Sequence, residues 1–171
     1  QRWSFRADPR TMRIALVGDS TMTEKSGYGN GFKANVIETA TLLNLARGGR
    51  SSKSYSAEGH WTDALRRHPT YVLVQFGHND VPGKGLDRET TLPVFRANMA
   101  RYVDEARAAG IKPILGKPLT RRYYGIDGGI HADLITYEDA KRRVSAEKTD
   151  PCRDPQEREH ALSEPRGDAA V

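Results

Sequence analysis

Short apolar runs alternate along the chain with longer amphipathic or polar stretches. The apolar runs are rich in β-branched residues and lie near residues 13–17, 41–46, 71–76 and 111–116. Runs of this length and composition are typical of buried strands. Predicted helices occupy residues 31–40, 60–67, 92–109 and 137–148. Strands that alternate with helices predict an α/β fold of three layers, α/β/α, with a mostly parallel central sheet.

Each of the first three apolar runs ends in small or polar residues. These exits read Gly18-Asp19-Ser20, then Gly48-Gly49-Arg50-Ser51, then Gly77-His78-Asn79-Asp80. The carboxyl ends of neighbouring parallel strands meet at one edge of the sheet, where open α/β sheets bind ligands. We therefore expect the three exits to converge. The alternative is that each exit is only a turn, because glycine, aspartate, serine and asparagine are all turn formers.

Together these exits resemble the motif blocks of the SGNH hydrolases, also called the GDSL esterase family, over roughly residues 12–148. Thr21, the Gly49-Arg50-Ser51 segment and the Gly-His-Asn-Asp form of the third exit are similar to the rhamnogalacturonan acetylesterase branch. The resemblance implies that Ser20 is the nucleophile of ester hydrolysis. It also implies that the backbone N–H of Gly49 and the side-chain amide of Asn79 stabilise the oxyanion.

The general base of such an enzyme is not identifiable in the sequence. The family's fourth block, Asp-x-x-His, supplies a histidine base and an aspartate that orients it, and this pattern is absent from the chain. We expect His78 to shape its loop, and His160 follows Asp154 at the wrong spacing for the block. The chain's five histidines are His60, His68, His78, His131 and His160.

The last part of the sequence differs in character from the rest. Residues 1–148 are predicted to form one SGNH hydrolase-like domain, whereas residues 149–171 carry many charges, several prolines and no apolar periodicity. Such a stretch is predicted to be disordered or loosely attached. One hypothesis is that this tail is not native, through a truncation or a frameshift that replaced a final strand and helix. Translating the coding DNA in the other two frames tests it.

Composition and charge limit the number of domains, the location and the kinds of partner that the sequence allows. The length of 171 residues suits one domain with a sizeable core, and no apolar run reaches membrane-spanning length. The single cysteine, Cys152, excludes an internal disulfide and carries no metal motif. No signal peptide is visible at Gln1, so we expect a cytoplasmic protein or a secreted one with its signal already removed. The net charge of +5 comes from scattered basic residues and favours a solvated surface over nucleic-acid binding.

These observations predict a serine esterase acting on acetyl or other short acyl esters of carbohydrates, without cofactor, metal, nucleic-acid or membrane partner. Arg121 and Arg122 follow the fourth apolar run and are hypothesised to meet uronate groups of such a substrate. One alternative is a catalytically impaired fold that serves as a non-catalytic carbohydrate-binding module. Another is a homo-oligomer in which a neighbouring chain supplies the missing base.

Overall fold

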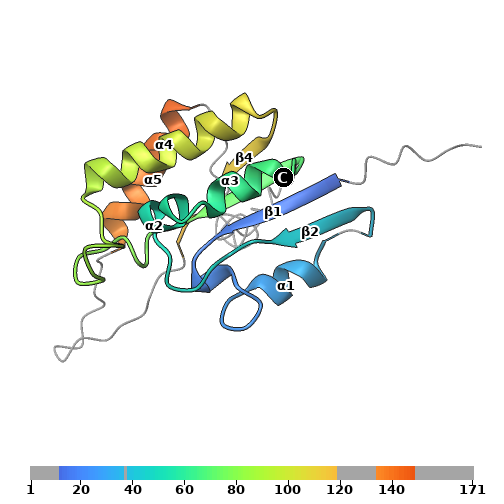
Figure 1. The fold of residues 1–171 in the computed structure, drawn as a ribbon, viewed down its shortest axis with the longest axis horizontal. Coiled ribbons are helices and arrows are strands. Elements are labelled where there is room, and N and C mark those ends of the chain that lie inside the picture. Colours follow the sequence, from blue (N-terminus) through green and yellow to red (C-terminus); the bar gives the residue numbers. More distant parts are fainter. Residues whose placement is uncertain (1–11, 37, 119–133, 149–171) are drawn as a thin grey trace, which may run out of the picture.

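The computed structural model describes residues 12–36, 38–118 and 134–148, and Figure 1 shows their arrangement. The chain order of the elements, with their bounds, is β1 (Met12–Gly18), the short 3-10 helix η1 (Ser20–Met22), α1 (Gly29–Ala34), β2 (Ala40–Asn44), α2 (Ser52–Ala57), α3 (His60–Arg66), β3 (Tyr71–Gln75), α4 (Leu92–Ala108), β4 (Lys112–Leu115) and α5 (Ile135–Glu147). This order confirms the predicted α/β class.

The four described strands form one parallel sheet in the order β2-β1-β3-β4. The chain runs outward from β1 to β2, then crosses back over β1 to β3 and continues to β4. The direction of winding therefore reverses between β1 and β3. In open α/β sheets this switch point opens a crevice at the carboxyl ends of the strands, and ligands bind there. Gly18, the last residue of β1, pairs with Gln75, the last residue of β3.

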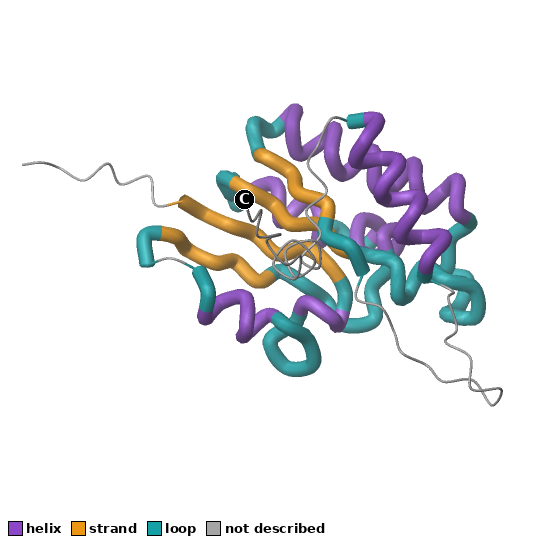
Figure 2. Tube along the Cα trace, turned by 180° about the vertical axis from the view of Figure 1, so that it is seen from behind, coloured by secondary structure: helices purple, strands orange, loops and turns teal. Residues whose placement is uncertain are grey.

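The reversal of winding also explains the layers, because right-handed crossovers in opposite directions place their helices on opposite faces of the sheet. Figures 1 and 2 show α1 on one face and α3, α4 and α5 on the other, so the three-layer prediction is confirmed.

The main core lies between the sheet and the layer of α3, α4 and α5. Alternate strand residues face it, and they pack against aromatic side chains of the helices. Its fully buried members include Ala15, Val17, Val72, Val74, Phe76, Trp61, Phe95 and Tyr102. Burial of each large apolar side chain contributes about 2 kcal/mol before the cost of ordering the chain. This core fixes β1 and β3 as a rigid support for the segments that follow them.

Two details of the helix prediction were wrong. The predicted helix 31–40 is the shorter α1, which ends at Ala34 because Asn35 caps it and β2 begins at Ala40. Helix α2 was not predicted, since its serine-rich sequence has weak intrinsic helix propensity. A capping box compensates locally: the Ser51 and Ser54 side chains each accept a hydrogen bond from the other residue's backbone N–H.

Candidate active site

Ser20 lies on a tight turn directly after β1. Asp19 caps η1, and its Oδ1 accepts hydrogen bonds from both the backbone N–H and the hydroxyl of Thr21, each at 2.8 Å. A Cβ at Gly18 would collide with the sulfur of Met22 and the carbonyl oxygen of Gln75, so only glycine fits there. The half-buried Ser20 is therefore presented by a turn whose backbone is fixed on both sides.

The second exit forms a turn beside Ser20. The Arg50 N–H donates to the Arg47 carbonyl, and Gly49 has a φ of 76°, as a type II turn requires at its third residue. The Arg47 N–H donates to the Gly18 carbonyl at 2.9 Å, which holds this segment against the first exit. A Cβ built on Gly48 would lie only 3.8 Å from Ser20 Cβ. The turn that carries Gly49 therefore borders the nucleophile directly.

The third exit reaches the same turn from the other side. Asn79 is 8% exposed, and its Nδ2 donates to the Arg50 carbonyl at 3.0 Å. An amide nitrogen carries two hydrogens, so one remains for a ligand. The 47–50 turn thus lies beside Ser20 at Gly48 and is hydrogen-bonded to Asn79 at Arg50. The structure brings together the segments that carry Ser20, Gly49 and Asn79, as the sequence predicted.

Asp80, the next residue, ties these segments to the helical layer. Its buried carboxylate accepts from the backbone N–H of Ser52 at 3.1 Å, the Ser52 hydroxyl at 2.6 Å and the Thr90 hydroxyl at 3.1 Å. Ser52 begins α2, so the carboxylate also lies at a helix N-terminus. Burial raises the pKa of Asp80 more than these hydrogen bonds lower it. Sequence reasoning gave Asp80 no role of its own.

A second buried carboxylate, Asp19, faces His78. The Asp19 Oδ2 and His78 Nδ1 atoms are 3.5 Å apart, and the two side chains are 0% and 1% exposed. Burial alone would raise the pKa of Asp19, but the imidazole of His78 and the hydrogen bonds from Thr21 outweigh it, so the pKa is lowered. His78 therefore links the third exit to the first through Asp19.

Two of the described histidines, His60 and His78, contact carboxylates. His60 begins α3, and its Nε2 contacts Glu58 Oε2 at 3.0 Å, while His68 follows α3 and has a positive φ of 45°. Five residues that the sequence analysis discussed in different roles lie outside the described residues: His131, His160, Arg121, Arg122 and Cys152.

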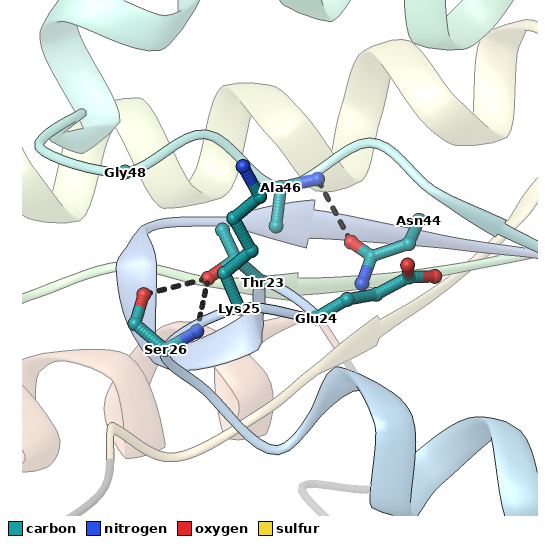
Figure 3. A pocket seen from close by; sticks show the side chains of 7 residues that line it. All are labelled: Thr23, Glu24, Lys25, Ser26, Asn44, Ala46 and Gly48. Carbon is teal, nitrogen blue, oxygen red and sulfur yellow. Dashed lines mark hydrogen bonds between the residues drawn. The ribbon is translucent and has the colours of Figure 1, made fainter.

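An open hollow of about 420 Å³ adjoins the nucleophile turn (Figure 3). It lies between the segment after η1 and the segment that leads from β2 to the 47–50 turn. Ser26, on its wall, donates a hydrogen bond from its hydroxyl to the Ser20 carbonyl at 3.4 Å. Most of its lining residues carry polar or charged side chains: Thr23, Glu24, Lys25, Ser26, Asn44, Ala46 and Gly48. The hollow offers hydrogen-bonding groups beside Ser20 and contains no large apolar side chain.

The sequence profile of the GDSL-like lipase/acylhydrolase family matches residues 16–170. The chain belongs to this family. The prediction from the motif blocks is therefore confirmed at the level of family.

Two similar proteins carry the name of the branch that the motifs resemble. Rhamnogalacturonan acetylesterase RhgT of Bacillus subtilis is 30% identical over 148 residues, which cover 81% of this chain and 62% of that protein. The chain thus spans less than two thirds of the length of this relative. Probable rhamnogalacturonan acetylesterase YesY of the same organism is 29% identical over 167 residues, covering 92% of this chain and 76% of that protein.

Solved structures support the fold independently of the motifs. The lipase/acylhydrolase from Enterococcus faecalis matches with a TM-score of 0.64 at 20% identity, over 87% of this chain and 78% of that one.

Among residues 12–36, 38–118 and 134–148, no three histidine, cysteine, aspartate or glutamate side chains gather as metal ligands would. Within the same ranges, no helix combines the length and apolar character needed to cross a bilayer.

Proposed function

We propose that this GDSL family member is a serine esterase that hydrolyses acetyl or other short acyl esters. Ser20 is the nucleophile, and the N–H of Gly49 and the amide of Asn79 bind the oxyanion. The observation that carries the proposal is the 47–50 turn, which contacts both the Ser20 and the Asn79 segments. A nucleophile and two kinds of N–H donor around one point are the requirements of acyl transfer.

In this mechanism the Ser20 oxygen adds to the ester carbonyl carbon, and its proton passes to a general base that the sequence does not identify. The carbonyl oxygen becomes negative and accepts hydrogen bonds from Gly49 and Asn79. Collapse of the intermediate breaks the ester bond, and the alcohol leaves with a proton. Water then hydrolyses the acyl-serine by the same steps and releases the acid. Each oxyanion donor is worth about 3 kcal/mol of transition-state stabilisation.

We further propose that the alcohol part of the substrate is a carbohydrate. The hollow beside Ser20 is lined by hydroxyl, amide and charged side chains, which suit a sugar better than a lipid chain. The names of the relatives from Bacillus subtilis support the same substrate class. Recognition of uronate groups by Arg121 and Arg122 stays a proposal about residues outside the described ranges.

The test is hydrolysis of p-nitrophenyl acetate by the wild-type chain and by Ser20→Ala. We expect Ser20→Ala to lower the rate by at least about 10³-fold. Ser56→Ala on α2, where the Ser56 hydroxyl accepts a surface hydrogen bond from Arg101, is the matched control and should behave as wild type. Equal rates for wild type and Ser20→Ala contradict the proposal.

One observation favours a second candidate function, a non-catalytic carbohydrate-binding module: the sequence contains no Asp-x-x-His segment to supply the general base. Binding of acetylated oligosaccharides without turnover, measured by calorimetry, would support this module. A specific rate that rises with protein concentration would instead indicate that a neighbouring copy supplies the base.

A further inference from the structure

A chain of buried hydrogen bonds runs from Tyr28 to the nucleophile turn. The Tyr28 hydroxyl donates to Gln75 Oε1 at 2.6 Å, and Gln75 Nε2 donates to the Thr21 hydroxyl at 3.0 Å. The Thr21 hydroxyl in turn donates to Asp19 Oδ1 at 2.8 Å. Gln75 and Asp19 are buried, and Tyr28 and Thr21 are half-buried. None of these contacts belongs to the oxyanion site.

Each link of this chain has only one orientation. The Asp19 carboxylate, whose pKa is lowered, can only accept, so the single proton of Thr21 must point to it. The Thr21 oxygen must then accept from the amide nitrogen of Gln75. This fixes the amide so that its oxygen faces Tyr28, and the phenol has to donate. Burial raises the pKa of Tyr28 and keeps that proton in place.

The chain of hydrogen bonds also joins three segments of the polypeptide across the switch point of the sheet. Gln75 ends β3, Thr21 belongs to η1, and Tyr28 immediately precedes α1. The backbone N–H of Tyr28 donates to the Thr21 carbonyl at 2.9 Å, so Thr21 is held through both side chain and backbone. Ser20 lies between Asp19 and Thr21 in sequence. The position of Ser20 therefore depends on Asp19 and Thr21, which the hydrogen bonds hold in place.

Apolar side chains of similar volume would fill this space without the cost of removing four polar side chains from water. A polar chain whose phenol, amide and hydroxyl are each hydrogen-bonded contributes instead a unique arrangement of the groups at its end. We infer that Tyr28 and Gln75 are positioning residues for Ser20, which act through Thr21 and Asp19. The inference rests on the proposed esterase function, because Ser20 is the residue that is positioned.

The test compares Tyr28→Phe and Thr21→Val, which remove one hydroxyl each, with Thr21→Ser, which retains the hydroxyl. Tyr71→Phe is the matched control, since Tyr71 is the first residue of the strand that Gln75 ends and lies at the end of that strand away from Ser20. We expect kcat for p-nitrophenyl acetate to fall about 10-fold in Tyr28→Phe and about 10²-fold in Thr21→Val, because small misplacements of a nucleophile have effects of this size. KM should stay within about twofold, and Thr21→Ser should recover most of the rate.

A second measurement does not depend on turnover. Hydrogen exchange of the Thr21 amide, which donates to Asp19, should accelerate at least about fivefold in Tyr28→Phe, relative to the Val74 amide in the core of β3. Unchanged exchange, or equal acceleration at Thr21 and Val74, overturns the inference and leaves only a structural role. An inactive wild-type chain whose Thr21 exchange responds to Tyr28→Phe would refute the esterase proposal but support the hydrogen-bond chain.

Discussion

Two buried aspartates at the same sheet edge, Asp19 and Asp80, hold the two halves of the site in different ways. Both are fully buried and both follow a strand that ends in the switch-point region. The pKa of Asp19 is lowered, because His78 and Thr21 favour its charged form more than burial disfavours it. The pKa of Asp80 is raised, because burial outweighs the hydrogen bonds from Ser52 and Thr90.

The difference reflects what each carboxylate connects. The hydrogen bonds of Asp19 go to a residue two positions later, so they shape one turn. Those of Asp80 go to Ser52 and Thr90, 28 and 10 residues away, and its carbonyl accepts a hydrogen bond from the Tyr137 hydroxyl of α5. The Asp19 carboxylate thus shapes the nucleophile turn locally, and the tertiary links of that turn run through Gln75 and His78 instead. The Asp80 carboxylate makes its hydrogen bonds directly to distant segments. Loss of Asp80 should therefore affect folding more than loss of Asp19.

The largest effect that we expect is on stability in Asp80→Ala. This change leaves the Ser52 N–H and the Ser52 and Thr90 hydroxyls buried without their acceptor. The free energy of unfolding should fall by about 3 kcal/mol, since each unsatisfied buried donor is costly. Urea denaturation measures it. Asp87→Ala, at an exposed position of the same segment, should change stability by less than about 0.5 kcal/mol. A similar loss in both variants would refute the role of Asp80.

The opposite pKa directions predict opposite pH dependences of stability. The folded pKa of Asp19 lies below 3.8, so its stabilising contribution is complete above pH 3.8 and is lost as pH falls through the folded pKa. The folded pKa of Asp80 lies above 3.8, so it lowers stability as pH rises from 3.8 through the folded pKa. Each slope is at most about 1.4 kcal/mol per pH unit.

Difference curves between wild type and Asp19→Asn or Asp80→Asn, from urea unfolding between pH 3 and pH 7, measure these slopes. Asp19→Asn should remove a loss of stability on the acid side. Asp80→Asn should remove a loss of stability as pH rises. Difference curves of the same sign for both variants would show that the two carboxylates have equivalent environments.

The contrast between local and long-range hydrogen bonds also explains which parts of the structure the sequence could predict. The β-branched runs and the turn formers after them identified β1, β3 and the exits at Ser20 and Asn79, because strand pattern and turn chemistry are local properties. The hydrogen bonds of Asp80 with Ser52 and Thr90 were not predictable, since they depend on how α2 and the segment before α4 pack. Nor was the link between Tyr28 and Gln75, which are 47 residues apart. The only indication of the Tyr28–Gln75 hydrogen bond in the sequence was that Gln75 is a polar residue at the end of an apolar strand.

The smallest effect concerns the two glycines of the 47–50 turn. Gly49→Ala places a side chain at a φ of 76°, which costs roughly 1 kcal/mol, although its nearest neighbour, Arg88 Nη1, would be 3.8 Å from the new Cβ. Gly48→Ala is the matched control, because its φ is not in the left-handed region and its Cβ would meet only Ser20 Cβ at 3.8 Å. Thermal unfolding should separate the two variants. Because relief of the strained φ would rotate the N–H of residue 49, Gly49→Ala should also lower kcat. Equal stability of the two variants would show that the turn tolerates an L-residue, and the oxyanion side would then be less rigid than its contacts with Asn79 indicate.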